Sequence, residues 1–451
     1  MNFSANPSVY ATAAAPALPR PVPRGEAAVR NRAASTTGDR LLQKMVFVAM
    51  ILEIVVFIEP APVDALLMVC LAAAVLSGKL DFSALGRPVL ISIGIFALLN
   101  LVSMYDPFNP QRAVAYVAIT LYLIASWFLF AGLIGRYGPP LMNKLIDAYS
   151  IAGLISALLG IAGYFHLVPF AGTLLLNGRA RGLFKDCNVY GPFFVPMGLF
   201  ALVRVMDSRN AARQRIWQGV LLAAAVVAIL LSFSRACWLN FGVSLVIVLA
   251  GQTFLLPGRG QISGLAGKVG ILAAGAITVM LLLSIPAVHS MFTIRVNSDR
   301  FQDYDRVRFA TQSLALEAAK QHPLGIGPGQ SEEIFDYATH SMYLRILTEN
   351  GLGALIALLV FMGATLARCW ILMRRAADPW MRELGLVVFA CIWGHVANSF
   401  VIDTVHWRSI WFIYALPWAT VPLQRFIRTL PATQRLGERY VRVPQPRLAR
   451  I

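Results

Sequence analysis

The sequence predicts an all-α polytopic membrane protein with about twelve transmembrane helices and one large periplasmic loop. Hydrophobic residues make up 58% of the 451 positions and charged residues only 14%, which is atypical of soluble domains. Apolar runs of roughly 16 to 22 residues recur along the chain, and each is long enough to cross a bilayer core as a helix. One long polar segment, residues 288–349, interrupts the series.

The chain begins with a tail, residues 1–44, that is rich in Ala, Pro and Arg and lacks apolar periodicity. We expect this tail to be disordered and cytoplasmic, and the late first apolar run to be a retained span rather than a signal peptide. Residues 45–287 then hold spans one to nine, residues 350–423 hold spans ten to twelve, and residues 424–451 form a second basic cytoplasmic tail. The predicted spans are residues 42–58, 62–77, 88–104, 113–134, 146–165, 190–205, 217–233, 236–256, 267–287, 350–367, 384–401 and 407–423.

The basic residues orient this topology. With both tails inside, 27 of the 39 Lys and Arg residues fall in cytoplasmic segments, as the positive-inside rule requires. The net charge of +17 therefore indicates contact with anionic lipids and not with nucleic acid. The basic residues left on the outer face are the exception to the rule, and an anionic ligand there would explain them.

The polar segment is expected to contain two helices. Apolar residues at helical spacing predict one helix from Tyr304 to Gln321, ended by Pro323. A second helix is expected to begin near Ala338 and to run into the tenth span, with a kink at Gly351 or Gly353.

His340 and Glu349 are the candidates for acid–base chemistry. A histidine accepts a proton near neutral pH, and a nearby carboxylate orients it or raises its pKa. The alternative is that His340 only caps a helix at the membrane interface.

Three arginines on the predicted outer face are candidates for binding a pyrophosphate: Arg179, Arg181 and Arg235. Guanidinium groups form paired, charge-assisted hydrogen bonds with phosphate oxygens. The alternative partners are lipid phosphates. The glycine-rich stretch GIGPGQSEE (325–333) suggests a phosphate loop, but its acidic residues and its proline favour a tight structural turn.

Other polar residues and cysteines are weaker candidates. Glu53, His395 and Asn398 lie inside predicted spans, either as hydrogen-bonded pairs or as a proton relay. Asp403 and His406 lie near the outer rim, where they join the site or form an ordinary turn. Cys187 and Cys237 either pair or, as we favour, pack as small apolar side chains. No cysteine or histidine spacing indicates a metal site.

Four motifs follow one another on the predicted outer face. They are R-x-R-G-L-F-K-D-x-N (179–188), S-F-S-R-A (232–236), H-P-L-G-I-G-P-G (322–329) and H-S-x9-G (340–351). Over roughly residues 170–365 this order resembles the O-antigen ligase and O-antigen polymerase superfamily of bacterial envelopes.

The resemblance implies a metal-independent, inverting glycosyltransferase of the bacterial inner membrane that uses no cofactor. Its expected donor is a glycan linked to undecaprenyl diphosphate, and its expected acceptor is lipid A core for a ligase or a carrier-linked glycan for a polymerase. The products would be O-antigen, exopolysaccharide or capsule. The family's loop histidine corresponds to His340. Its diphosphate-binding arginines correspond to Arg181 and Arg235, with Arg306 or Arg308 contributed by the loop helix.

Two other classes of protein stay open. A secondary transporter also fits twelve spans with both ends inside, although the polar residues concentrate in an outer loop and not at the bilayer midplane. A non-catalytic envelope scaffold is the third class. It predicts that His340 and the outer arginines are individually dispensable.

Overall fold

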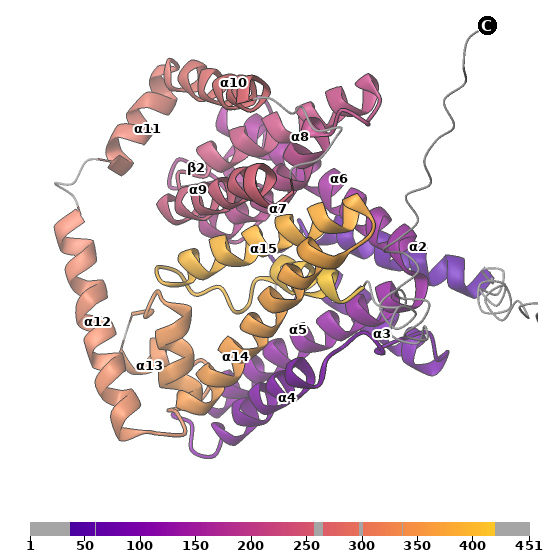
Figure 1. The fold of residues 1–451 in the computed structure, drawn as a ribbon. Coiled ribbons are helices and arrows are strands. Elements are labelled where there is room, and N and C mark those ends of the chain that lie inside the picture. Colours follow the sequence, from indigo (N-terminus) through magenta and orange to yellow (C-terminus); the bar gives the residue numbers. More distant parts are fainter. Residues whose placement is uncertain (1–36, 59, 257–264, 297–300, 336, 420–451) are drawn as a thin grey trace, which may run out of the picture. The chain divides into compact units, whose positions relative to one another are not determined.

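The computed structural model describes residues 37–58, 60–256, 265–296, 301–335 and 337–419, and the side chains of residues 265–266, 301–306 and 419 lie outside this description. The chain divides into residues 1–41 and 42–451, and the architecture below is that of the second unit. The described residues are mostly helical, with one two-stranded sheet (Figure 1). The all-α prediction is therefore confirmed.

Each of the twelve predicted apolar runs overlaps at least one described helix. In chain order the elements are α2 (Thr37–Leu52), α3 (Pro62–Leu76), α4 (Arg87–Val102), α5 (Pro110–Tyr137), α6 (Pro139–Tyr164), η1 (Ala171–Leu174), β1 (Leu175–Leu176), β2 (Arg179–Ala180), α7 (Cys187–Met206), α8 (Ala212–Leu231), α9 (Arg235–Ala250), η2 (Gly251–Leu255), α10 (Leu265–Leu283), α11 (Pro286–Val296), α12 (Phe301–Gln321), α13 (Ser331–Ile334), α14 (Met342–Arg375), α15 (Pro379–Ser399), α16 (Arg408–Ala415) and η4 (Leu416–Ala419).

The described residues contain 7 helices that are long and apolar enough to cross a membrane: α5, α6, α7, α8, α9 with η2, α14 and α15. The pair α10 and α11 raises the number to 8 if it forms one span, although the chain bends by 100° between the two helices. Helices α3 and α4 are apolar but shorter. The protein is thus a multi-pass membrane protein with seven or eight candidate spans, and the number twelve stays a prediction.

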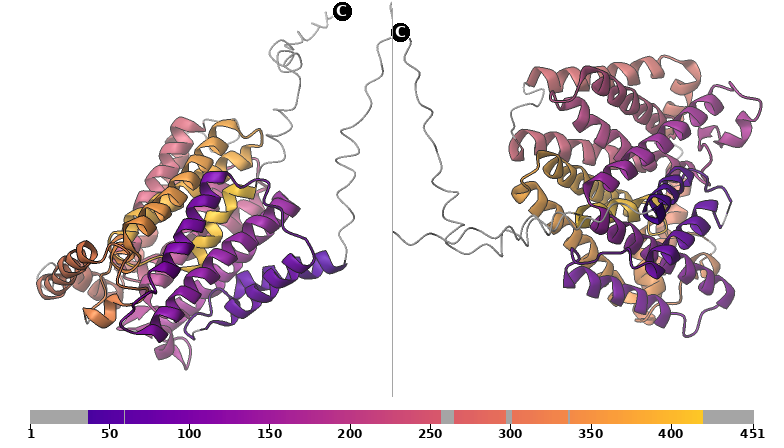
Figure 2. Two further views of the ribbon diagram at one scale, coloured as in Figure 1. Left: turned by 90° about the horizontal axis from the view of Figure 1, so that it is seen from below. Right: turned by 90° about the vertical axis from the view of Figure 1, so that its right-hand side faces the viewer.

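Helix α14 is the central element beside the site. It packs between α4 and α15, and α15 in turn packs against α9 (Figures 1 and 2). Asn350 of α14 donates a hydrogen bond from Nδ2 to Asn100 Oδ1 of α4 at 3.1 Å, and Phe361 stacks edge to face on Trp127 of α5. A buried polar pair therefore fixes α14 to α4, and a pair of buried aromatic rings fixes it to α5.

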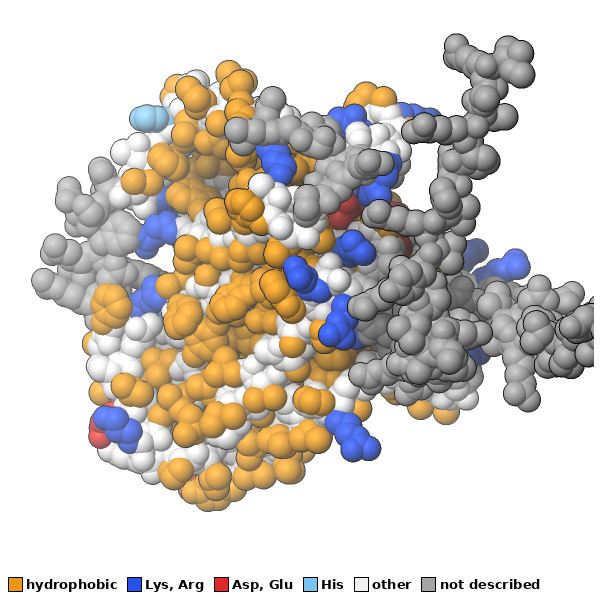
Figure 3. All heavy atoms as spheres, in the orientation of Figure 1, with side chains coloured by type: hydrophobic (Ala, Val, Ile, Leu, Met, Phe, Trp, Pro, Cys, Tyr) orange, Lys and Arg blue, Asp and Glu red, His pale blue; other side chains and the backbone are white. Residues whose placement is uncertain are grey.

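Much of the described surface is apolar. Large hydrophobic side chains such as Leu76, Leu98, Met280 and Leu352 are exposed, and Figure 3 shows hydrophobic side chains over most of one face of the molecule. In water such a surface would be unfavourable, whereas lipid tails solvate it without cost. The exposed surface thus agrees with a membrane environment.

The polar segment matches one predicted helix and corrects the other. Helix α12 ends at Gln321, two residues before Pro323, which confirms the first. The second was predicted to begin near Ala338 and to run through His340, and this is wrong. Helix α14 begins at Met342 because Ser341 caps it, accepting a hydrogen bond from the Leu344 N–H. His340 precedes the cap with φ +48°, in the left-handed region.

The predicted kink is confirmed at Gly351. Its φ of +82° and ψ of 170° interrupt α14, and a Cβ there would lie 2.3 Å from the carbonyl oxygen of Pro323. Only glycine tolerates both this backbone conformation and this close approach. The kink therefore lets the start of the His322–Gln330 loop pack directly on α14.

Candidate functional site

A cavity of about 940 Å³ lies where the β1–β2 hairpin, the turn before α9, α11, α12, α14 and the loop after α15 meet. Nine ionisable side chains line it: Arg179, Asp186, Arg235, Arg295, Arg308, Glu332, His340, Arg345 and Asp403. Five of them are arginines, and they come from segments far apart in the sequence. A cavity with this lining suits a large, polar and mainly anionic ligand.

The β1–β2 hairpin places Arg179 at the cavity. Asn177 and Gly178 both have positive φ, as a two-residue hairpin turn requires, and Leu176 pairs with Arg179 across the strands. Arg179 then donates from Nε to the Ser232 carbonyl at 2.9 Å and from Nη2 to Asn188 Oδ1 at 3.1 Å. These bonds join the hairpin to the turn between α8 and α9.

The turn S-F-S (232–234) separates α8 from α9. Phe233 has φ +44°, and Ser234 caps α9 by accepting from the Cys237 N–H at 3.4 Å. Arg235, the first residue of α9, is exposed and lines the cavity. Arg295 of α11 donates from Nε to the Phe233 carbonyl at 3.2 Å. Arg179, Arg235 and Arg295 are therefore gathered around one turn.

Arg308 of α12 lies beside His340. Its Nη2 approaches the carbonyl oxygens of His340 and Val401 at 3.4 and 3.3 Å. Its Nε is buried and has no hydrogen-bond partner within the described part of the chain. Since a buried, unpaired guanidinium nitrogen is costly, this donor fits a ligand atom in the cavity.

The surroundings of His340 favour its neutral form. Burial and the positive charge of Arg308 lower the pKa of His340 below its ordinary value, and the carboxylates of Glu332, Asp186 and Asp403 offset part of this effect. At neutral pH the imidazole is therefore uncharged, which is the form that can take up a proton.

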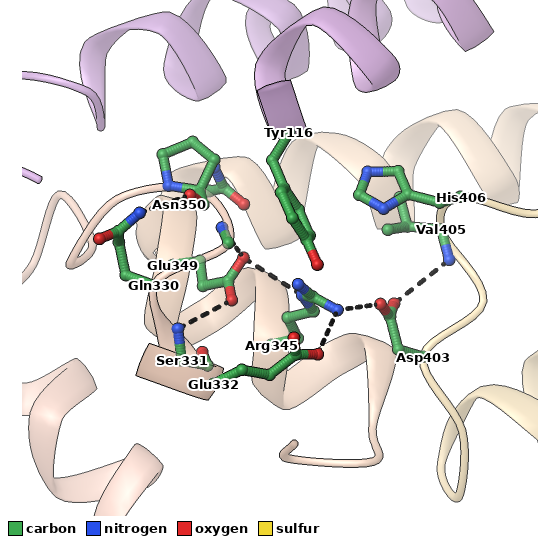
Figure 4. Close-up of polar contacts among 12 residues, drawn as sticks. Tyr116, Gln330, Ser331, Glu332, Arg345, Glu349, Asn350, Asp403, Val405 and His406 are labelled. Carbon is green, nitrogen blue, oxygen red and sulfur yellow. Dashed lines mark hydrogen bonds and ion pairs between the residues drawn. The ribbon is translucent and has the colours of Figure 1, made fainter. Parts of the chain in front are cut away.

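Arg345 of α14 is the centre of an ionic network (Figure 4). Its Nε donates to Glu349 at 3.2 Å, and its Nη1 lies 2.5 Å from Asp403 and 3.7 Å from Glu332. The ring of Tyr116 lies 4.8 Å from the guanidinium carbon. Burial alone would raise the pKa of Asp403, but Arg345 and His406 hold it below its usual value.

Glu349 belongs to this network but is not among the residues that line the cavity. Its side chain is 4% exposed, and it accepts hydrogen bonds from the Gly329 N–H at 2.6 Å and the Ser331 N–H at 3.2 Å. The loop with glycines 325, 327 and 329, all at positive φ, is thus closed on a carboxylate of the same chain. These contacts support the predicted structural turn, because the N–H groups that would bind a phosphate are occupied.

The predicted site residues do not all meet. Arg179, Arg235, Arg308 and His340 line the same cavity, and Asp403 joins them. Arg181 points elsewhere and donates from Nε to the Thr173 carbonyl at 3.2 Å. The side chain of Arg306 lies outside the described residues. The diphosphate-binding roles of the arginines and the catalytic roles of His340 and Glu349 stay predictions.

The remaining candidates lie apart from the cavity. His406 is 3.0 Å from Thr120 Oγ1 and stacks on Tyr116, while His395 contacts Thr404 Oγ1 at 3.3 Å. Glu53 and Asn398 are buried without side-chain hydrogen bonds to other described residues, so no relay between them is visible within that part of the chain. All five cysteines are buried and free, as the packing interpretation of Cys187 and Cys237 expected.

Sequence reasoning missed several residues of the cavity. Asp186 caps α7 and Glu332 belongs to the short helix α13, so each resembles an ordinary surface residue in the sequence. Arg295, in the last turn of α11, was visible only as one of the basic residues on the predicted outer face. Two patterns in the sequence could have indicated parts of the site. The i,i+4 spacing of Arg345 and Glu349 predicts an ion pair on one helix face, and Asn177-Gly178, just before Arg179, predicts a hairpin turn. No group of three or more His, Cys, Asp and Glu side chains in the described residues is arranged to hold a metal ion.

Comparison with known proteins agrees with this geometry. Residues 219–359 match a family model described as O-antigen ligase, and the matched region includes Arg235, α12, the glycine loop and His340. No curated protein matches the chain significantly. The family match confirms the predicted resemblance and supports a function of the O-antigen ligase type in envelope polysaccharide biosynthesis.

Proposed function

Because part of the chain matches the O-antigen ligase family, we propose that this protein is a glycosyltransferase of the bacterial inner membrane that moves a glycan from undecaprenyl diphosphate to an acceptor sugar hydroxyl on the periplasmic face. The supporting observation is that His340 and five arginines line one cavity. Its volume of about 940 Å³ accommodates a diphosphate together with sugar rings.

The proposed reaction is a direct displacement at the anomeric carbon of the donor. The acceptor oxygen forms the new glycosidic bond while the bond from that carbon to the diphosphate oxygen breaks, which inverts the configuration. The acceptor proton passes to the neutral ring nitrogen of His340. Arg179, Arg235 and Arg308 stabilise the charge that builds up on the departing diphosphate.

We propose that this reaction needs no metal ion, since the guanidinium groups supply the positive charge that a metal supplies elsewhere. The acceptor is lipid A core if the protein is a ligase and a carrier-linked glycan if it is a polymerase. Both reactions need the same donor-binding arginines and the same base, so the cavity is compatible with either.

Removal of the protein should leave its donor unused. In a strain that lacks it, we expect long polymer on undecaprenyl diphosphate for a ligase, or single repeats on the carrier without long polymer for a polymerase. Wild-type protein should clear the intermediate. Arg235→Gln should clear it poorly, because the loss of a charged hydrogen bond to phosphate weakens donor binding about 10- to 100-fold.

Arg213→Gln is the matched control for this experiment. Arg213 is exposed in the first turn of α8, at the opposite end of that helix from the turn that precedes Arg235. Lipopolysaccharide, secreted polysaccharide and carrier-linked glycans should be extracted together. If all three pools were unchanged in the null strain, the glycosyltransferase proposal would be wrong and a transporter would become the better interpretation.

The pH dependence of transfer should report on Arg308. Transfer needs neutral His340, so kcat/KM should fall as the pH drops through the lowered pKa of that group. Arg308→Gln removes one cause of the lowering and should therefore move the acid limb to higher pH, whatever it does to the maximum rate. The measurement is kcat/KM of purified protein across the acid range, with Arg213→Gln as the control. An acid limb that stayed in place would contradict His340 as the base beside Arg308.

A further inference from the structure

Apart from His340 and the single carboxylate of Asp186, the ionisable side chains that line the cavity fall into two groups. Arg179, Arg235 and Arg295 surround the 232–234 turn, and Arg308 extends this basic group towards His340. Glu332 and Asp403 form an acidic group held together by Arg345. His340 lines the same cavity, with its carbonyl oxygen 3.4 Å from Arg308 Nη2, and it experiences the negative charges of Glu332, Asp186 and Asp403.

The acidic group keeps an excess of negative charge. Arg112 of α5 pairs with Glu332 and Glu333, and Arg345 pairs with Glu332, Glu349 and Asp403. Four carboxylates thus share two guanidinium groups, which leaves a formal charge of −2. An anionic ligand would be repelled here, whereas the positive charges of the basic group would attract one.

The acidic group is also open to a ligand. The side chains of Glu332 and Asp403 are 34% and 19% exposed, and both line the cavity. Arg345 is 8% exposed and lines it too, and its Nη2 has no hydrogen-bond partner among the side chains and backbone that the structure describes. Acceptor oxygens and an unpaired donor therefore occur side by side.

This combination matches a sugar hydroxyl. A hydroxyl donates one hydrogen bond and accepts two, so it can donate to a carboxylate oxygen of Glu332 or Asp403 while it accepts from Arg345. A phosphate or a carboxylate only accepts, and would leave the acidic oxygens facing negative charge. The site consequently favours uncharged, hydroxyl-rich rings.

We propose that Glu332, Asp403 and Arg345 form the acceptor subsite, and that this subsite takes an uncharged sugar and discriminates against an acidic one. The inference rests on the proposed glycosyltransferase function and adds the class of acceptor to it. It also assigns the donor and the acceptor to different parts of the cavity. The diphosphate of the donor occupies the basic group, the acceptor ring occupies the acidic group, and His340 lies where the acceptor hydroxyl meets the donor.

The test is a separation of the two KM values. Full-length protein in lipid nanodiscs is given carrier-linked glycan extracted from the null strain and acceptor glycolipid from the same source. Glu332→Gln and Asp403→Asn keep the side-chain shape, and each should raise KM for the acceptor about 10- to 100-fold while KM for the donor changes less than about twofold. Arg235→Gln should instead raise KM for the donor and leave KM for the acceptor nearly unchanged. Glu317→Gln, at an exposed position of α12, is the matched control.

A second probe addresses charge. Oxidation of the acceptor's terminal primary hydroxyl to a carboxylate should lower the kcat/KM of wild-type protein for the acceptor at least about tenfold. In Glu332→Gln the ratio of kcat/KM between the neutral and the oxidised acceptor should be smaller. Equal use of both acceptors, or variants that raise KM for the donor as much as for the acceptor, would overturn the subsite. Absence of any transfer by wild-type protein would instead overturn the proposed function. Melting temperatures of all variants show whether a loss comes from unfolding.

Discussion

Replacing His340 by glutamine is expected to slow glycan transfer about 10²- to 10⁴-fold, the usual contribution of a general base. Glutamine keeps hydrogen-bonding capacity but cannot take up a proton. The His340 side chain lines the cavity between Arg308 and the carboxylates, outside any helix, so the substitution should leave the fold intact. The measurement is the initial rate of transfer by purified protein at saturating donor and acceptor.

The control for this variant is His289→Gln, since His289 is exposed on α11 and does not line the cavity. Both variants should accumulate to wild-type levels in membranes. Transfer by His340→Gln at more than about a tenth of the wild-type rate would remove His340 from its proposed role. It would also revive the scaffold interpretation, in which individual residues of the cavity are dispensable.

Replacing Glu349 by alanine should have the largest effect on stability, about 3 to 5 kcal/mol, the cost of breaking a buried ion pair from one side. The Gly329 and Ser331 N–H groups lose their acceptor in this variant, and Arg345 loses one of its carboxylates. We expect a lower melting temperature and little folded protein. Glu349→Gln retains one acceptor oxygen and should be intermediate.

This pair of variants separates two roles for Glu349. A carboxylate that orients His340 would give a folded, inactive Glu349→Gln protein with a normal melting temperature. The contacts of Glu349 favour the other result, in which activity per folded molecule is largely kept while stability falls. Glu317→Ala controls for the loss of a carboxylate on an exposed helix face.

Several parts of the fold follow from the sequence alone. The apolar runs each become helix because a hydrocarbon environment forces the backbone to satisfy its own hydrogen bonds. The end of α12 before Pro323 and the kink at Gly351 follow from the backbone properties of proline and glycine. His340 was visible through its motif, and the family match includes that motif.

Other parts depended on the tertiary structure. The start of α14 was misplaced because a short polar side chain, Ser341, competes with helix propensity and caps the helix after His340. Arg181 and Arg179 share one motif, yet only Arg179 lines the cavity. Strand β2 ends at Ala180, so Arg181 lies beyond the strand, where its backbone N–H donates to the Leu174 carbonyl and its Nε to the Thr173 carbonyl.

The site as a whole likewise combines features that the sequence predicts with features that depend on the tertiary structure. Composition, periodicity and motifs determined a helical membrane protein with a candidate histidine, since these properties are local. The pairing of Arg345 with Asp403, 58 residues further along the chain, and the grouping of cavity charges into a basic and an acidic set were decided only by the packing of α14 against its neighbours. Charges separated by long stretches of chain interact only after folding removes them from water and fixes their distances.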